Sequence, residues 1–362
     1  MIDESDFLDL FIPGPVNVSK ECREKMALPM IAHRSDTMGN LHQDIASYLQ
    51  KMLFTQNQII LSTSSSTGLM EAAIRNCVDK KGVLNIVNGA FAERWHEVAK
   101  ANGKLAGTLD IDWGKAVTKN QLKEKLEEKE YDAVCITQNE TSTGVTTPLK
   151  DLYKIVKDHN CLLLVDAVSA AGGVEARIDD WEIDFYLFGL QKCMALSPGL
   201  AVAAVSEAAF EFAKTVPNRG LYFDLLDLKK YHNKNGMQPA TPVIPIYYQL
   251  QFQLHRIVDE EGIENRWARH TEMADYTRNW ARKKGFTLFA DEICASNTVT
   301  CINSKGINVT QLKNDLKKKG YFFSTGYGKF KENNFRIAHM GDRTLDEVKK
   351  YLSTIDQLTE DF

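Results

Sequence analysis

Short apolar runs alternate with longer amphipathic stretches between residues 58 and 205. Runs that are apolar throughout are typical of strands covered on both faces, and the stretches between them place apolar residues near helical spacing. The alternation therefore predicts an α/β domain in which parallel strands are joined by helical crossovers. The predicted strands cover residues 58–62, 83–87, 133–137, 161–165, 184–189 and 200–205, and the predicted helices cover 67–77, 92–101, 119–130 and 148–159.

The pattern changes beyond residue 205. Residues 217–245 combine prolines with interleaved aromatic residues, which predicts an irregular crossing segment. Residues 247–284 predict a long helix that is interrupted near Gly262. The rest of the chain predicts a smaller α+β domain, with strands at 296–303 and 334–339 and helices at 309–320 and 344–358.

Composition and charge narrow the possible functions. The 362 residues include 44 basic and 48 acidic side chains, so there is no positive excess to neutralise a nucleic acid or an anionic membrane. No apolar run approaches the roughly 18 residues of a membrane-spanning helix, and the start, MIDESDF, shows no secretory-signal pattern. The seven cysteines are scattered without metal-ligand spacing, which favours a reduced, cytoplasmic setting and predicts no metal site.

A carboxylate and a lysine each follow a predicted strand. In CLLLVDAVSAAGG, Asp166 comes directly after an apolar run, and in GLQKCMALSPG, Lys192 lies among apolar neighbours. Ligands of parallel sheets collect at the carboxyl ends of the strands, and a buried lysine has the uncharged, nucleophilic amine that Schiff-base chemistry requires. Taken alone, Asp166 has helix capping as its alternative role, and Lys192 has a place in a surface loop.

A hydroxyl-rich turn precedes the predicted helix at 67–77. Residues 64–68, SSSTG, place small side chains and backbone N–H groups at a helix N-terminus, where the helix macrodipole favours an anion such as phosphate. The turn alone is weak evidence, because such clusters are common and the glycines of a P-loop are missing. A phosphate site, a carboxylate and a nucleophilic lysine together match the phosphate, ring nitrogen and aldehyde of pyridoxal 5′-phosphate (PLP).

Three further motifs accompany these residues: IPGPVNVS at 12–19, NETSTGV at 139–145 and FRIAHMG at 335–341. With these motifs, nearly the whole chain resembles the class V, fold-type I PLP aminotransferases, in the branch of alanine–glyoxylate, serine–pyruvate and archaeal-type phosphoserine aminotransferases. The resemblance implies a large domain at residues 16–256 with a mostly parallel seven-stranded sheet flanked by helices. It also implies a small α+β domain formed by residues 1–15 and 257–362, and a cytoplasmic homodimer with active sites at the subunit interface.

The resemblance implies how the cofactor is held. Lys192 corresponds to the Schiff-base lysine, which also moves the substrate's α-proton, and Asp166 corresponds to the partner of the ring nitrogen. Phe91 and Val168 correspond to the residues on the two faces of the ring. The remaining contacts, to the phosphate and the phenolic oxygen, are implied for Ser65, Ser66, Thr67, Ser142, Gln191 and, from the neighbouring subunit, Thr241.

The resemblance also implies ping-pong transfer of an amino group between a small L-amino acid and a 2-oxo acid. Arg336 corresponds to the arginine that binds the substrate carboxylate, for which a bidentate guanidinium is suited, and Gly14 belongs to a loop that closes over the substrate. His33 and Arg34 match a pair that meets the substrate phosphate from the other subunit in phosphoserine aminotransferases, although relatives with smaller substrates share it. Phosphoserine, serine or alanine therefore remain open as donors, and 2-oxoglutarate, pyruvate or glyoxylate as acceptors.

Three other functions stay open from the sequence. A cysteine desulfurase of the same fold needs a cysteine on a mobile loop and usually a histidine stacked on the ring; this chain has Phe91 there, and Cys294 and Cys301 lie around a predicted strand. A binding protein that keeps the fold but has lost the chemistry is disfavoured by the intact set of matched residues. A metal-dependent hydrolase is disfavoured because the eight histidines show no paired spacing.

Overall fold

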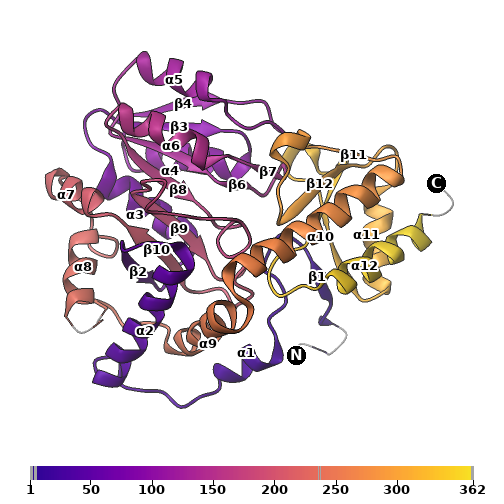
Figure 1. Cartoon of the computed structure of the whole chain (residues 1–362), viewed down its shortest axis with the longest axis horizontal. Coiled ribbons are helices and arrows are strands. Elements are labelled where there is room, and N and C mark those ends of the chain that lie inside the picture. The colour runs from indigo at the N-terminus through magenta and orange to yellow at the C-terminus, as the bar shows by residue number, and fades with distance from the viewer. Residues whose placement is uncertain (1–2, 4–5, 235, 237, 360–362) are drawn as a thin grey trace.

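A seven-stranded sheet forms the centre of the larger lobe in the computed structural model, which describes residues 3, 6–234, 236 and 238–359 (Figure 1). All neighbouring strands are parallel except the two pairs that involve β10. The expected mostly parallel seven-stranded sheet is therefore confirmed. Its strands, in spatial order, are β2 (Gln58–Ser62), β10 (Ala201–Val205), β9 (Phe185–Gly189), β8 (Leu162–Asp166), β5 (Ala133–Thr137), β3 (Val83–Val87) and β4 (Ala106–Asp110).

Two strands differ from the sequence prediction. β10 is antiparallel to both of its neighbours, whereas the apolar pattern predicts parallel strands throughout. The reason is that residues 190–200, which join β9 to β10, are too few for a parallel crossover, which takes a dozen or more. β4 is missing from the prediction because its sequence, AGTLD, is partly polar, in keeping with its place at the exposed edge of the sheet.

Helices cover both faces of the large sheet. The core residues of β8 alternate between the two layers, with Leu163 and Val165 on one face and Leu162 and Leu164 on the other. This double burial explains why the strand is apolar throughout. The first face carries α2 (Asp36–Leu53), α5 (Lys119–Glu127), α6 (Leu149–Asp158) and α9 (Ile244–His255), and the second carries α3 (Ser66–Cys77), α4 (Ala90–Ala101), α7 (Glu207–Thr215) and α8 (Leu225–Asn233).

The smaller lobe contains a five-stranded sheet that the N-terminal segment joins, because β1 pairs in parallel with β13. The predicted strands and helices of this lobe are confirmed as β12, β14, α11 and α12, whereas β1, β11 and β13 are absent from the prediction. The domain boundaries themselves stay a prediction. The strands, in spatial order, are β1 (Asp9–Phe11), β13 (Tyr321–Thr325), β14 (Asn334–Ala338), β12 (Val299–Asn303) and β11 (Thr287–Leu288), and the helices are α10 (Ile263–Lys283), α11 (Val309–Lys318) and α12 (Leu345–Leu358).

A long helical segment connects the two lobes (Figure 1). After α9 the chain continues through a π-helical turn at Arg256–Glu261 and then, after Gly262, into α10. The interruption predicted near Gly262 is confirmed, because this residue has a φ of 79°, in the left-handed region that favours glycine.

The segment at 217–245 is more regular than its prolines predict, because it contains α8. The Asp224 side chain accepts a hydrogen bond from the backbone N–H of Leu226 at 2.9 Å, which caps the start of the helix. Leu225 and Leu228 are buried against the sheet layer. A local cap and two core contacts therefore overcome the irregular sequence pattern.

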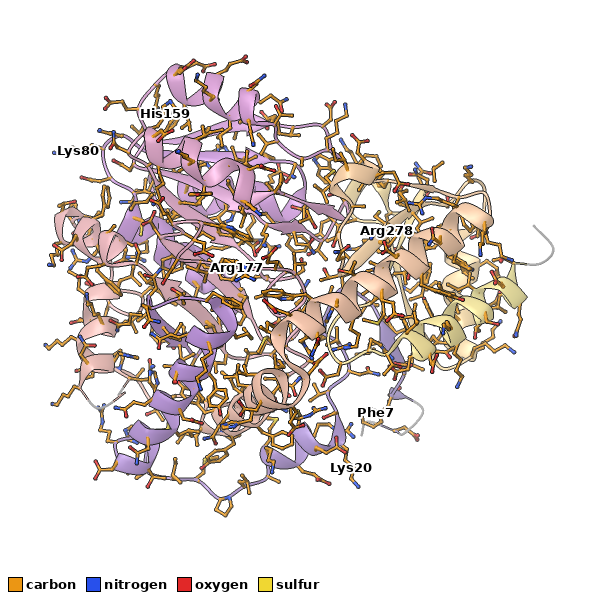
Figure 2. All side chains as sticks on the ribbon, in the orientation of Figure 1. Phe7, Lys20, Lys80, His159, Arg177 and Arg278 are labelled. Atoms are coloured by element: carbon orange, nitrogen blue, oxygen red, sulfur yellow. The ribbon has the colours of Figure 1, made fainter. Side chains whose placement is uncertain are left out.

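Charged side chains such as Lys20 and Lys80 project outward from the ribbon (Figure 2). Among the residues that the structure describes, no helix combines the length and the apolar character needed to cross a membrane.

Candidate active site

Most of the residues expected to bind the cofactor meet at one cavity of about 210 Å³, at the carboxyl-end edge of the large sheet. Its walls come from segments that follow β2, β3, β5, β8 and β9. The predicted residues that line it are Ser65, Ser66, Thr67, Phe91, Asp166, Val168, Gln191 and Lys192. The lining also includes Met70, Arg94, Asn139, Thr141 and Ser169, which the sequence analysis does not assign.

Asp166 and Lys192 both face this cavity and are buried, with exposed fractions of 3% and 8%. Burial raises the pKa of Asp166 to about 7, even though the Val168 N–H donates a hydrogen bond to its Oδ1 at 2.8 Å. Burial also lowers the pKa of Lys192 to about 8, and the nearby Asp166 opposes that change. The lysine therefore yields an uncharged, nucleophilic amine close to neutral pH.

The hydroxyl-rich turn forms a hollow at the N-terminus of α3. Ser65 precedes the helix without a side-chain capping bond, and the buried Ser66 Oγ has no hydrogen-bond partner in the described structure. A Cβ on Gly189 would lie 2.5 Å from both Ser66 Oγ and Gln191 Oε1, so only glycine leaves this hollow open. An unpartnered hydroxyl and free helical N–H groups fit a phosphate.

Phe91 is held in place by a buried glutamate. The Glu140 Oε2 atom accepts hydrogen bonds from the backbone N–H groups of Phe91 at 3.0 Å and Ala92 at 2.8 Å, and its Oε1 atom accepts from the Ser142 hydroxyl at 2.6 Å. These bonds satisfy N–H groups in the first turn of α4, which have no partner within the helix. Burial raises the pKa of Glu140, against the effect of these bonds. Glu140 therefore positions the aromatic side chain at the cavity.

Arg336 comes from the small lobe and reaches the wall of the cavity. Its Nε donates to the Thr325 carbonyl at 3.0 Å, and one terminal nitrogen donates to the carbonyl of Thr141, a lining residue, at 3.3 Å. Arg336 is only 9% exposed, yet in the described residues no carboxylate forms an ion pair with it. A buried guanidinium that is bonded only to carbonyls is suited to bind a carboxylate from outside the chain.

Gly14 packs directly on the lysine. A Cβ on this residue would lie 2.7 Å from Lys192 Cδ, and Gly14 has a φ of 91°. Both facts require glycine in the loop between β1 and α1 (Lys20–Lys25). The predicted loop residue, Gly14, therefore lies against the Lys192 side chain.

Six predicted residues lie outside the lining of the cavity: Gly14 and Arg336, which contact lining residues, and four others. Ser142 bonds to Glu140 beside the start of α4. His33 and Arg34 precede α2, and Thr241 precedes α9; Arg34 and Thr241 are exposed. The resemblance implies that His33, Arg34 and Thr241 act at the site of a neighbouring subunit, and these roles stay predictions.

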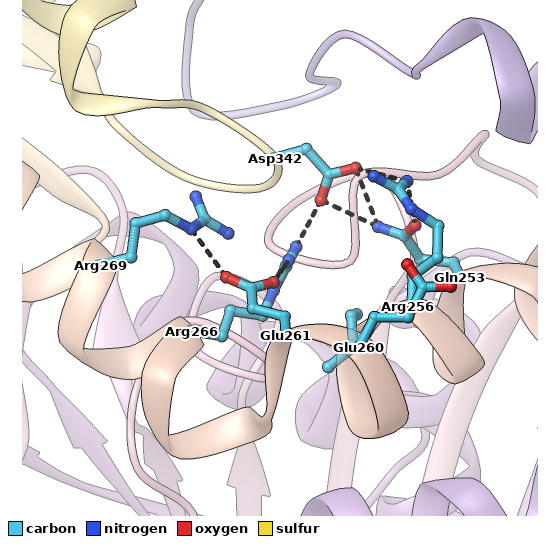
Figure 3. Close-up of a pocket in the computed structure, with 8 residues that line it drawn as sticks. Gln253, Arg256, Glu260, Glu261, Arg266, Arg269 and Asp342 are labelled. Carbon is cyan, nitrogen blue, oxygen red and sulfur yellow. Dashed lines mark hydrogen bonds and ion pairs between the residues drawn. The ribbon is translucent and has the colours of Figure 1, made fainter.

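A second cavity, of about 340 Å³, lies at the π-helical turn (Figure 3). All its arginines are paired with acids: Arg256 and Arg266 contact Asp342, and Arg266 and Arg269 contact Glu261. This cavity therefore has no unpaired arginine to offer a ligand, unlike the first. Arg266 also donates at 2.7 Å to the carbonyl of Cys193, the residue after Lys192, so these ion pairs support the loop that carries the lysine.

Comparison with known proteins identifies the family. The family model described as "Aminotransferase class-V" matches residues 18–329. The chain is a class V aminotransferase. An uncharacterised aminotransferase of Methanocaldococcus jannaschii is 39% identical over 355 residues, which cover 96% of this chain and 91% of the relative. The L-aspartate–glyoxylate aminotransferase of Paracoccus denitrificans is 31% identical over 364 residues, with coverages of 97% and 91%.

Solved structures agree with this membership. The crystal structure of alanine–glyoxylate aminotransferase from Nostoc sp. matches 97% of this class V aminotransferase and 95% of that chain, with a TM-score of 0.92 and 27% identity. The fold is therefore that of the fold-type I enzymes, and the cofactor of the family is PLP. The buried lysine, the strand-end carboxylate and the phosphate hollow described above fit this cofactor.

Several residues of the site are not predicted by the sequence patterns. Asn139 and Thr141 lie within the motif NETSTGV, and Ser169 lies within LLLVDAVSAAGG, so their motifs were the available signal. Thr141 Oγ1 and Ser169 Oγ are 2.8 Å apart, which links the loops after β5 and β8. Glu140 also lies within NETSTGV, but charged residues are usually solvated, so only the fold shows that Glu140 is buried and that Arg94 lines the cavity.

Proposed function

We propose that this class V aminotransferase moves an amino group from L-serine or L-alanine to glyoxylate. The observation that carries the proposal is Arg336, the buried guanidinium without an acidic partner that reaches the cavity wall at Thr141. It offers one site for an α-carboxylate. Lys192 and Arg94 are the only basic residues in the described lining, so the lining offers no further cation for an acidic substrate side chain, which favours substrates with uncharged side chains.

The roles of the residues follow from their environments. When bound, PLP joins covalently to a lysine amine and accepts electrons from the substrate's α-carbon. Lys192 would take the α-proton and return it, and its pKa of about 8 suits a base that works near neutral pH. Asp166 would hold a proton on the ring nitrogen, Phe91 would cover a face of the ring, and Arg336 would orient the α-carboxylate.

The names of two of the relatives support glyoxylate as the acceptor. The enzyme of Paracoccus denitrificans is named for aspartate and glyoxylate, and that of Nostoc sp. for alanine and glyoxylate. Glyoxylate has no side chain beyond its aldehyde, so it needs no further charged group from the lining. The neutral donor is inferred from the lining and not from these names.

We also propose that the enzyme is a homodimer with shared active sites. Leu28 and Met30 are 46% and 67% exposed in the segment that leads to His33 and Arg34. Tyr222, 49% exposed, donates to the carbonyl of Thr63 beside the phosphate turn. Exposed apolar side chains around residues expected to serve a neighbouring site favour a second copy of this chain as their partner. Sedimentation should give twice the mass of the chain; a monomer with full activity would exclude shared sites.

The donor is tested by mixing the PLP-loaded enzyme with single amino acids and following the loss of its yellow absorbance. We expect serine and alanine to react faster than aspartate, glutamate or phosphoserine. The pyridoxamine form should then recover its colour faster with glyoxylate than with 2-oxoglutarate. Phosphoserine as the fastest donor, with a loss of that rate but not of the alanine rate in Arg34→Ala, would replace the neutral donor by a phosphorylated one.

A further inference from the structure

Arg94 is a cationic side chain in the cofactor cavity that forms no ion pair in the described structure, although its charge acts on Asp166 through space. It lies on α4, one turn after Phe91, and its guanidinium carbon is 5.1 Å from the centroid of the Phe91 ring. One terminal nitrogen is 3.4 Å from Thr67 Oγ1, at the start of α3. This contact places the guanidinium beside the phosphate hollow.

The hollow itself is deficient in positive charge. A phosphate monoester carries a charge of about −1.5 to −2 at pH 7, and a helix N-terminus supplies the equivalent of roughly +0.5. The side chains expected around the phosphate, those of Ser65, Ser66, Thr67 and Gln191, are neutral. About 1 to 1.5 negative charges would therefore remain unbalanced in a partly buried site, which is unfavourable.

We propose that Arg94 is the cationic ligand of the cofactor phosphate. Of the two basic residues in the described lining, Lys192 is the covalent partner of the cofactor, so Arg94 remains to balance the phosphate. Its contact with Thr67 places it at that end of the cavity, and stacking on Phe91 holds the guanidinium in a fixed orientation. The inference rests on the PLP site of the proposed function and not on the identity of the donor.

Two other roles for Arg94 make different predictions. If it served only to hold the Phe91 ring, its loss would weaken every ligand that stacks on that ring, with or without a phosphate. If it bound an acidic group of the substrate, its loss would leave the affinity for the cofactor unchanged. Comparing PLP with pyridoxal, which lacks the phosphate but retains the ring and the aldehyde, separates these cases.

The test titrates cofactor-free protein with PLP and with pyridoxal, and follows the change in absorbance on binding. We expect Arg94→Gln to weaken PLP binding by about 10- to 100-fold, the range of a lost charge-assisted hydrogen bond, and to leave pyridoxal binding within about twofold. Arg94→Lys should keep most of the affinity, because it retains the charge. Lys100→Gln is the matched control, because Lys100 is an exposed cation in the last turn of the same helix.

A second measurement distinguishes the loss of a phosphate contact from misfolding of the variant. Inorganic phosphate should compete with PLP for the wild-type hollow, and Arg94→Gln should weaken that competition about as much as it weakens PLP binding. Unchanged PLP affinity, or an equal loss for PLP and pyridoxal, would overturn the inference. Failure of the wild-type protein to bind PLP at all would instead contradict the proposed function.

Discussion

Asp166 is expected to destabilise the cofactor-free protein, and Asp166→Asn should relieve this effect. The side chain is 3% exposed, and in the described residues its carboxylate accepts one hydrogen bond, from the Val168 N–H at 2.8 Å. Burial raises its pKa from the ordinary value of 3.8 to about 7. Between these two values the folded protein binds a proton that the unfolded chain releases, so stability falls as the pH rises from about 4 to 7.

The size of the effect follows from that interval. About three pH units, at about 1.4 kcal/mol each, give an upper estimate of about 4 kcal/mol that is lost above pH 7. Asparagine has nearly the same shape, keeps an oxygen for the Val168 N–H and does not ionise. The cofactor-free Asp166→Asn variant should therefore match the wild type near pH 4 and exceed its free energy of unfolding by several kcal/mol at pH 8.

The assay is urea unfolding of both cofactor-free proteins at pH values from 4 to 8, followed by tryptophan fluorescence. Asp132→Asn serves as a control with the opposite sign. The buried Asp132 Oδ2 accepts backbone N–H bonds from Asp79 at 2.7 Å and from Lys81 and Gly82 at 3.1 Å, so its loss should destabilise the protein. Parallel stability–pH curves for the wild type and Asp166→Asn would show that burial does not raise the pKa of Asp166.

Three further predictions concern the same site. Glu140→Gln should lower the free energy of unfolding by about 2 kcal/mol and also weaken PLP binding, because an amide cannot accept all the hydrogen bonds that the carboxylate receives. The control is Asp132→Asn, at the other end of β5, which should lower stability without changing PLP binding. An equal effect of both variants on PLP binding would contradict a positioning role for Glu140. Ser66→Ala should not lower the stability of the cofactor-free protein, because the Ser66 hydroxyl is buried without a partner, but should weaken PLP binding roughly five- to tenfold; a loss of stability above about 1 kcal/mol would show that the hydroxyl has another partner. Arg336→Lys should lower kcat/KM for the amino donor by roughly 30- to 150-fold with an unchanged cofactor spectrum; unchanged steady-state kinetics would remove Arg336 from substrate binding.

The buried carboxylate and lysine at the strand ends can be picked out in the sequence because burial leaves a strong pattern. A run that is apolar throughout predicts a strand covered on both faces, and Asp166 directly after such a run is an exception that indicates function. Lys192 is visible for the same reason, as a lysine among apolar residues. The antiparallel direction of β10 depends on the short connection that contains this lysine, and the apolar pattern of the strand does not show it.

The remaining contacts depend on tertiary structure. Arg336 follows Asp166 by 170 positions and reaches the site only because β14 pairs within the small sheet, so the family resemblance was needed to assign it. In the sequence Glu140 looks like an ordinary charged residue, and only the folded structure shows that it accepts hydrogen bonds from the first turn of α4. His33 and Thr241 lie in loops where sequence patterns carry little information, and their expected partners belong to another subunit.

Reductive labelling shows whether Lys192 and Asp166 serve one PLP molecule in the same cavity. The PLP-loaded enzyme is treated with sodium borohydride and digested, and the pyridoxyl group is located by mass spectrometry. We expect the pyridoxyl group on Lys192, and a marked loss of labelling at low PLP concentration in Asp166→Asn. A label on another lysine, or none on the wild-type enzyme, would contradict it.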